Sequence, residues 1–387
     1  MGGAVALMLA RKGVSVTLFD QADAPFSGAS RWNEGKIHLG YLYAGDPSLE
    51  TARSVLPGGL AFKALTEELI GCSLDAATTQ DDDTYLIHRD SVASLGATAG
   101  YFSAVSALAR EHADASRYLV DLSDRNARTL SPAELERDYD TAKIQGGFRV
   151  PERSVSTQWL ADRFVDALGA QPRIALAMAT RVTAVREDGA RFHVETANGP
   201  DGPFDFVVNA LWEGRLAIDA SVDIAPPPTW SHRFRLSLFA RTAQALTLPS
   251  TVLATGPFGD IKNYNGRDFY LSWYPSGLIA EGAEIAPPPA PALSPADRAR
   301  VIRDVLAELG AYVRAVPQIG AGADIRLEGG WVYAAGKGSL ADPRSTLHRR
   351  DQAGIQRRGG YFTVDTGKYS IAPWLAQKIT DAILGQG

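Results

Sequence analysis

The chain has 387 residues, of which 45% are apolar and 21% charged, and its formal net charge at neutral pH is −5. This length and apolar content allow two domains with a sizeable core, while the acidic balance and scattered basic residues argue against nucleic acid as a partner. The single cysteine, Cys72, excludes an internal disulfide framework and a cysteine-rich metal site, and we predict no metal. No apolar stretch reaches membrane-spanning length and no leader pattern opens the chain, so we expect a cytoplasmic protein without a membrane span.

The first twenty residues predict a helix, a turn and a strand. Apolar residues recur at helical spacing over residues 3–12, a glycine follows as a C-cap, and residues 14–19 form a short β-branched run before Asp20. This is the second half of the dinucleotide-binding fingerprint, whose last glycine is Gly2. The first strand and the other glycines of that motif would lie upstream of Met1, so we expect an N-terminus truncated within the motif.

The next segments predict a loop followed by helices and one strand. Residues 27–46 are rich in Gly, Ser and Asn and indicate an irregular loop with a short extended piece at 36–43. Asp46 has the position of an N-cap, with Pro47 at the first helical position, and opens a helix toward Leu69. Beyond it the patterns predict a strand at 84–88 and helices at 101–112, from Ser131 onward and at 157–168.

The second half of the chain begins with short β runs. These lie at 174–178, 182–186, 191–195 and 204–209 and predict a small antiparallel meander that returns to a buried strand. Prolines at 226–228 mark a boundary, after which an alternating run predicts a strand of a different sheet at 234–241. Then come a proline-rich loop, a helix from Pro295 through about Arg314, a strand at 361–365 and a C-terminal helix at 372–384.

Four segments, in this order, resemble one protein family. They are the half fingerprint, the sequence SGASRWNEGKIHLGYLY at 27–43, the passages 180–185 and 205–211, and the sequence GGYFTVDTGKYSIAPW at 359–374. In these segments the chain resembles the D-amino-acid-oxidase-like (DAO) superfamily of FAD-dependent oxidoreductases. It is nearest in motif to the L-2-hydroxyglutarate dehydrogenase and glycine oxidase branches.

The resemblance implies an α/β fold with two domains. One is a Rossmann-like FAD-binding domain whose first strand would be missing here, and the other is an inserted α+β substrate domain built on an antiparallel sheet. We expect a discontinuous FAD-binding domain formed by residues 1–72, 145–220 and 328–387. The substrate domain then takes residues 73–144 and 221–327.

The resemblance also implies the residues that bind FAD. A carboxylate after the second strand accepts bonds from the ribose hydroxyls, small residues let the backbone approach the cofactor, and a cationic turn before a helix stabilises anionic reduced flavin. Because Cys72 lies outside any attachment motif, we expect noncovalent FAD. The predicted cofactor residues are Gly2, Asp20, Ser30, Asn33, Gly35, Lys36, Val182, Gly367, Lys368, Tyr369 and Ser370.

The activity implied is hydride transfer to flavin N5 from a carbon next to an amine or a hydroxyl of a small carboxylate substrate. Arg233 and Arg349 are the candidates for binding the carboxylate, because the planar guanidinium matches its geometry. Oxidation of a hydroxyl needs a base, for which His38 and His348 are the candidates. The hydroxy acid is slightly favoured, and the electron acceptor is open.

Two rival functions stay open at this point. A truncated or degenerate member without FAD would act as a binding protein, and the absent first strand favours it. An NAD-dependent dehydrogenase shares the fingerprint but has no need of the flavin-like segments 27–43 and 359–374.

Overall fold

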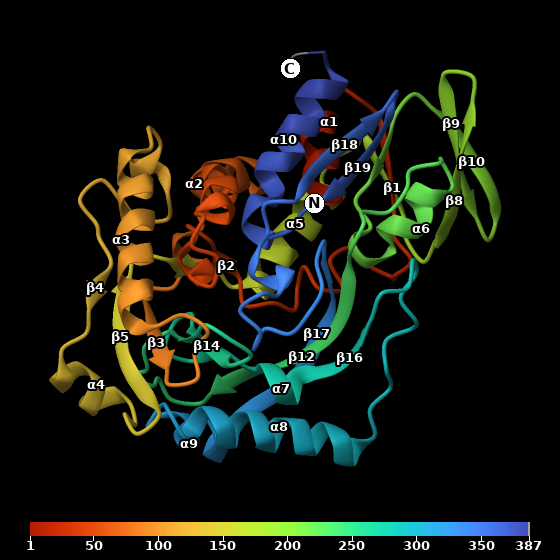
Figure 1. Ribbon diagram of the computed structural model, residues 1–387. Coiled ribbons are helices and arrows are strands. Elements are labelled where there is room, and N and C mark those ends of the chain that lie inside the picture. Colours follow the sequence, from red (N-terminus) through yellow and green to blue (C-terminus); the bar gives the residue numbers. More distant parts are fainter. Residues whose placement is uncertain (386–387) are drawn as a thin grey trace.

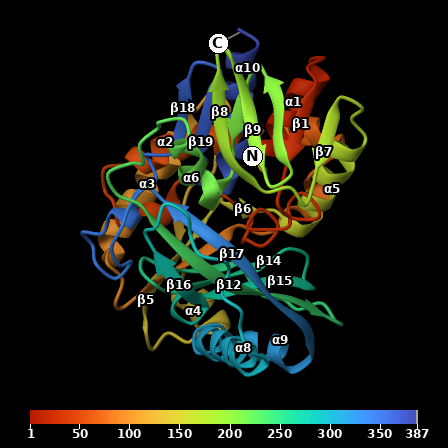
Figure 2. The ribbon, with the colours of Figure 1, turned by 90° about the vertical axis from the view of Figure 1, so that its right-hand side faces the viewer.

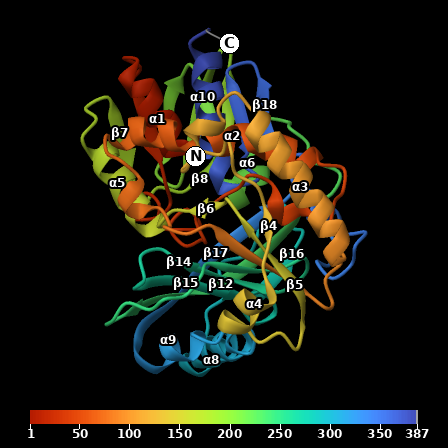
Figure 3. The ribbon, with the colours of Figure 1, turned by 90° about the vertical axis from the view of Figure 1, so that its left-hand side faces the viewer.

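A computed structural model describes residues 1–385, which form a mixed α/β fold with two parts. One part holds short parallel sheets and most of the long helices, and the other is a large sheet with helices on its outer face (Figure 1). The same division is visible from the two sides of the molecule (Figure 2 and Figure 3). The predicted α/β class with a part built on a largely antiparallel sheet is therefore confirmed.

The helix, turn and strand expected at the N-terminus are present. Helix α1 (Gly2–Arg11) buries its apolar face, and Gly13 then adopts φ +85°, which glycine reaches without strain. Strand β1 (Val16–Phe19) follows and pairs in parallel with β7 (Ile174–Ala177). Asp20 consequently lies at the carboxyl end of β1, the edge at which open α/β sheets bind ligands.

A second small sheet joins the end of the meander to the C-terminal region. Its order is β11 (Val207–Asn209), β19 (Tyr361–Asp365) and β18 (Gly354–Arg358), with β11 and β19 parallel. The meander itself contains β8 (Val182–Asp188), β9 (Arg191–Thr196) and β10 (Gly199–Phe204). The single run expected at 204–209 is split, because the chain pairs with β9 up to Phe204 and joins another sheet from Val207.

Four helices cover these sheets and form one core: α1, α2 (Glu50–Ile70), α5 (Thr157–Gly169) and α10 (Ala372–Ile383). The prediction that Asp46 caps α2 is wrong. Asp46 accepts from the Ser48 backbone in a turn, and Leu49 has φ +63°, so helical geometry first becomes possible at Glu50.

The large sheet is organised by β12 (Ser231–Thr242), which pairs along its whole length with β17 (Ala323–Ala334). Strands β5 and β17 carry this sheet across the predicted domain boundaries at 145 and 328. The other strands are β3 (Asp83–His88), β4 (Arg128–Thr129), β5 (Ile144–Val150), β13 (Thr251–Ala254), β14 (Gly259–Asn263), β15 (Asp268–Trp273) and β16 (Leu278–Gly282).

The two faces of β12 differ in chemistry. Phe234, Leu236 and Leu238 belong to the core shared with α8 (Pro295–Gly310) and α9 (Val316–Gly322), the helices below the sheet in Figure 1. Arg233 and Arg235 alternate with them, and successive side chains of a strand point to opposite faces. The polar face of the large sheet is thereby turned toward the other part of the molecule.

The remaining elements are β2 (Lys36–Ile37), which pairs with β6 (Arg153–Ser154), and the helices α3 (Leu95–Glu111), α4 (Pro132–Asp138), α6 (Arg215–Ala220) and α7 (Tyr274–Gly277). None of the helices within residues 1–385 combines the length and apolarity needed to cross a bilayer.

Candidate active site

A cavity of about 1960 Å³ lies between the two parts and is lined by residues of both. On one side it touches α1, β1 and β11, and on the other the polar face of β12, β14 and β15. Typical small-molecule pockets have roughly 300–1,000 Å³. The cavity therefore has room for a dinucleotide together with a further small molecule.

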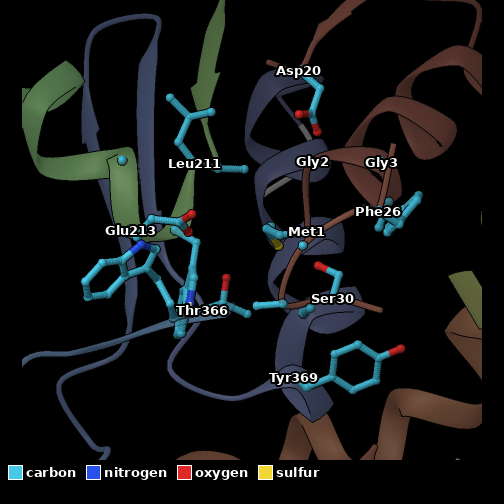
Figure 4. Close-up of a pocket in the computed structure, with 18 of the residues that line it drawn as sticks. Met1, Gly2, Gly3, Asp20, Phe26, Ser30, Leu211, Glu213, Thr366 and Tyr369 are labelled. Carbon is cyan, nitrogen blue, oxygen red and sulfur yellow. Dashed lines mark hydrogen bonds between the residues drawn. The ribbon is translucent and has the colours of Figure 1, made fainter. Parts of the chain in front are cut away.

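One end of the cavity has the features of a nucleotide site. Figure 4 shows Asp20, then Gly2 and then Ser30 and Tyr369 following one another along the cavity. Among residues 1–385 the carboxylate of Asp20 accepts only from the nearby backbone N–H of Ala22, at 2.9 Å, which leaves its second oxygen for a ligand. Val182 also lines the cavity, at the start of β8.

The loop at 27–43 is organised by one of the predicted cofactor residues. Ser30 and Asn33 line the cavity, but the Asn33 amide donates to the Ala29 carbonyl at 2.8 Å and accepts from the Gly35 backbone at 2.8 Å. Gly35 is not among the lining residues. It has φ +65°, and a Cβ there would lie 1.9 Å from the Val155 carbonyl oxygen, so the close packing of this loop requires a glycine.

Lys36 borders the cavity, yet its ammonium is held inside the protein. Its Nζ lies 2.6 Å from Asp83 Oδ2 and 3.4 Å from Glu152 Oε2, and Lys262 binds the same Asp83 oxygen at 2.6 Å. Burial by itself lowers the pKa of Lys36, but Asp83, Tyr85 and Glu152 raise it well above its usual value. Lys36 is therefore a charged group that anchors the cavity wall.

His38 lines the cavity with an imidazole that is only 1% exposed. Burial lowers its pKa well below 6.5, and the neighbouring charges of Lys368 and Lys36 lower it further. The Nδ1 atom has no hydrogen-bond partner within residues 1–385, and Nε2 lies 4.0 Å from Glu34 Oε1. At neutral pH the ring is uncharged and able to accept a proton.

The turn before α10 brings a second cation to the cavity. Gly367 has φ +61° and donates from its backbone to Asp365, which orients the turn. Burial and the nearby Arg350 lower the pKa of Lys368 to about 8. Gly367, Lys368 and Tyr369 line the cavity, whereas Ser370 is fully buried behind it.

Two arginines project from β12 into the opposite end of the cavity. Arg233 donates from Nη1 to the Tyr274 hydroxyl at 3.0 Å, and Arg235 donates from Nη2 to the Ser272 hydroxyl at 2.8 Å. The Arg235 guanidinium also lies over the Tyr274 ring, 4.3 Å from its centre. Neither arginine has a carboxylate within 4.0 Å among residues 1–385, and the Nε of each is buried without a partner. These cations are available to an anionic ligand.

Arg349 and Arg350 are neighbours in sequence, but their side chains have different surroundings. Arg349 is exposed, lies outside the large cavity and pairs with Asp351 at 2.5 Å. Arg350 lines the cavity instead, and burial together with the charge of Arg233 lowers its pKa. His348 also lines the cavity, but its Nε2 is within 2.9 Å of the Asp342 carbonyl oxygen.

Four acidic lining residues were not among the sequence candidates, namely Glu34, Asp205, Glu213 and Asp260. Glu34 lies in the loop before β2, and Asp260 lies in β14 directly opposite Ser272 of β15. The Asp260 carboxylate makes no hydrogen bond and no ion pair with the described residues, although burial raises its pKa to about 6. In the sequence, Glu34 and Asp260 each stand two positions before a lysine of a short strand. This was the only feature that could have pointed to them, and it does not indicate a site by itself.

The residues around the cavity fit an FAD molecule. The Asp20 carboxylate lies at one end of the cavity, and small residues at the start of α1 line its middle. The cationic turn with Lys368 follows, before the arginines of β12. Gly3 leaves no space for a side chain, since a Cβ there would lie 2.8 Å from the Phe26 ring. A narrow middle section between two charged ends suits an extended dinucleotide.

Solved structures share this architecture. Glycine oxidase from Geobacillus kaustophilus superimposes with a TM-score of 0.72 at 16% identity, covering 100% of this chain and 92% of that one. Iminodiacetate oxidase from Chelativorans sp. BNC1 has a TM-score of 0.68 at 14% identity, with 100% and 93% covered. L-proline dehydrogenase from P. horikoshii has a TM-score of 0.65 at 14% identity, with 99% and 90% covered. At these identities the likeness shows a shared fold.

No curated protein matches the chain in sequence. The family model described as FAD dependent oxidoreductase, DAO, matches residues 1–357. The resemblance of the four sequence segments is thus confirmed over most of the chain. The chain belongs to the DAO family of FAD-dependent oxidoreductases, and FAD is its cofactor.

Proposed function

We propose that this oxidoreductase acts on a small carboxylate substrate, which it oxidises at a CH–NH or CH–OH group, and that it holds FAD noncovalently. The observation that carries the proposal is the buried guanidinium of Arg233 in the cavity, which has no carboxylate partner among residues 1–385. A buried charge without a partner costs several kcal/mol, so the site favours a ligand that brings a negative charge to it.

FAD would be held by the residues that line the cavity from Asp20 to the turn before α10. Asp20 would accept hydrogen bonds from the ribose hydroxyls, and the backbone N–H groups at the start of α1 would bind the phosphates. Gly367 and Lys368 would hold the flavin. Bound FAD supplies a two-electron acceptor for the hydrogen leaving the α-carbon of the substrate. Ser30, Val182 and Tyr369 complete this wall.

The substrate carboxylate would lie between two arginines. Arg233 presents its fork to a carboxylate in the bidentate geometry that this pair prefers, with Arg350 as the second cation. Tyr274 holds Arg233 through the 3.0 Å hydrogen bond and thereby limits its rotation. This arrangement orients the α-carbon, because a ligand held at two points cannot turn freely.

His38 would take a proton from a hydroxyl substrate. Its pKa lies well below 6.5 because of burial and of nearby lysines, so the imidazole is neutral at pH 7 and has a free lone pair. His348 is the second candidate base, with Nδ1 available. An NAD-dependent reaction has no such support, since the family match concerns FAD enzymes.

The first experiment is an anaerobic titration of the purified holoenzyme with matched amino acids and 2-hydroxy acids, followed by the bleaching of the flavin absorbance. We expect bleaching by at least one carboxylate compound. Arg233→Lys keeps the charge but removes the fork and should raise KM by roughly 30- to 100-fold, about 2–3 kcal/mol. Arg241→Lys, at an exposed position of the same strand, is the matched control.

Flavin that is bleached by none of these carboxylates would overturn the proposed substrate class. Equal KM values for Arg233→Lys and the control would overturn the role of Arg233. Noncovalent attachment is tested by acid precipitation of the protein. We expect all flavin in the supernatant, because the only cysteine, Cys72, is exposed and lies outside the cavity.

A further inference from the structure

The substrate end of the cavity contains charges of both signs. Arg233, Arg350 and Lys368 form a cationic group, and no carboxylate of residues 1–385 pairs with any of them within 4.0 Å. Glu34 and Asp260 are the carboxylates that border the same space. A ligand with one negative and one positive group complements this distribution better than a singly charged anion.

Asp260 is the more distinctive of the two carboxylates. It is fixed in β14 between β13 and β15, opposite Val252 and Ser272. Ser272 accepts a hydrogen bond from Arg235. Within residues 1–385 no hydrogen bond and no ion pair to the Asp260 carboxylate is formed, although the residue is only partly exposed. A carboxylate costs free energy in such a place unless a donor reaches it.

From this geometry we propose that Asp260 binds the amino group of the substrate and accepts its proton, so that the site selects an amino acid over the corresponding hydroxy acid. The inference rests on the proposed function, and it assigns to that site the amine rather than the hydroxyl. It also assigns a role to a residue that no motif indicates.

The groups that face Asp260 leave it available for this task. Lys262, on its own strand, and Lys36, from β2, are both bound to Asp83. Arg235, from β12, is held by Ser272 and by the Tyr274 ring. The other facing groups are Glu34 and the phenols of Tyr264 and Tyr270, whose pKa values are raised chiefly by burial, so that both phenols are neutral.

The protonation state of Asp260 suits a proton acceptor. Burial raises its pKa to about 6, Lys262 opposes this shift, and Glu34 adds to it. Asp260 is therefore ionised at pH 7 and protonated below about 6. A carboxylate with a pKa close to the working pH is a better general base than one with an ordinary value.

The proposed proton step is balanced without a further reactant. One N–H bond of the substrate ammonium breaks, its electron pair stays on nitrogen, and an O–H bond forms on Asp260. The free amine then has the lone pair that assists the loss of the α-hydrogen. A 2-hydroxy acid carries no positive charge at this position, so its hydroxyl can donate a hydrogen bond to the Asp260 carboxylate but forms no ion pair with it.

The test compares the wild-type holoenzyme with Asp260→Asn. Dissociation constants are measured from shifts of the flavin absorbance, with unreactive carboxylates that bear either an amino or a hydroxyl group on the same carbon skeleton. Turnover of the matched substrates is measured from pH 5 to 9. Asp324→Asn is the control, because Asp324 is exposed on β17 and does not line the cavity.

We expect the wild type to prefer the amine, and Asp260→Asn to reduce the amine-to-hydroxyl ratio by about 10- to 100-fold, as the loss of one charge-assisted hydrogen bond predicts. The acidic limb of kcat/KM for the amine, near pH 6, should disappear in the variant. Asp260→Ser gives the same comparison if the amide variant folds poorly, which flavin content and thermal unfolding reveal.

An amine-to-hydroxyl ratio that is unchanged in Asp260→Asn, or a wild type that prefers the hydroxy acid, would overturn the inference and leave the proposed function intact. Flavin that no carboxylate compound reduces would overturn the proposed function. In that case the binding comparison still decides whether Asp260 recognises an amine.

Discussion

Lys262 donates from Nζ to Asp83 Oδ2 at 2.6 Å and links strands β14 and β3 across the interior of the large sheet. Lys36 binds the same oxygen at 2.6 Å, and the three side chains are at most 2% exposed. One carboxylate thus compensates two buried cations, and Glu152, at 3.4 Å from Lys36, adds a second acid to the cluster. Through Lys36, which lines the cavity, this cluster supports the cavity wall.

Removal of the charge at position 83 should destabilise the protein strongly. Asp83→Asn leaves Lys36 and Lys262 without a full counter-charge, and breaking a buried pair of this kind costs about 3–5 kcal/mol. The measurement is the urea midpoint of unfolding of the holoenzyme. Asp75→Asn is the control, because Asp75 pairs with Lys63 at the surface and its loss should change stability by less than about 1 kcal/mol. Equal effects would contradict the structural role of Asp83.

The same cluster predicts a direction for the pH dependence of stability. Burial raises the pKa of Asp83, but Lys262 and Lys36 lower it to a net value below 3.8. A carboxyl group with a depressed folded-state pKa stabilises the protein above the unfolded value and loses that contribution as pH falls. The wild type should therefore lose stability below about pH 4 more steeply than Asp83→Asn. Parallel curves for the two proteins would be inconsistent with the pairing.

Asp20 should contribute to the affinity for FAD. Asp20→Asn removes a charged acceptor from the ribose hydroxyls, and we expect the dissociation constant of FAD to rise by roughly 10- to 100-fold, about 1.4–2.8 kcal/mol. The measurement is the quenching of flavin fluorescence during reconstitution of the apoprotein. Asp23→Asn, at an exposed position that does not line the cavity, is the control and should leave the constant unchanged.

Lys368 should set the reduction potential of the flavin. Burial and Arg350 lower its pKa to about 8, so its positive charge is present below pH 8 and is lost as pH rises through that value. A cation stabilises anionic reduced flavin, and Lys368→Met should lower the midpoint potential by about 30 mV, which corresponds to about 1.4 kcal/mol for two electrons.

The pH dependence separates this electrostatic role from a structural one. In the wild type the potential should fall additionally between pH 7 and 9, and in Lys368→Met this extra slope should be absent. Lys378→Met, in α10 beyond the cavity, is the control, because its ammonium lies over the exposed side of Trp374. A potential that is equal in both variants would count against the predicted position of the flavin.

Gly35 should tolerate no side chain. Gly35→Ala places a Cβ 1.9 Å from the Val155 carbonyl oxygen and also has to adopt φ +65°. Gly13→Ala is the matched control, since its φ is +85° and no atom lies within 4 Å of its Cβ. Both variants should lose about 1–2 kcal/mol through backbone strain, and Gly35→Ala should lose clearly more. Equal losses in denaturant unfolding would show that the loop moves away without cost.

The sequence by itself determined those features that depend on local pattern. Helical spacing followed by a glycine identified α1 and its end at Gly13, and an alternating run identified β12. Short β runs identified β8 and β9 of the meander, whereas the run at 174–178 pairs in parallel with β1. The order of four short segments identified the family, and each of these segments contributes residues to the lining of the cavity. Such signals lie within a few residues of one another and do not depend on distant parts of the chain.

The tertiary structure decided which charged side chains face the cavity. Arg349 and Arg350 are neighbours in sequence, yet the path of the loop turns the first to Asp351 and the second inward. Lys36 is drawn away from the ligand space by Asp83, and Asp260 enters it because β14 pairs with β15. These outcomes depend on the partners that burial supplies from remote segments. The sequence therefore determined what kind of protein this is, and only the packing of its two parts decided which residues form the site.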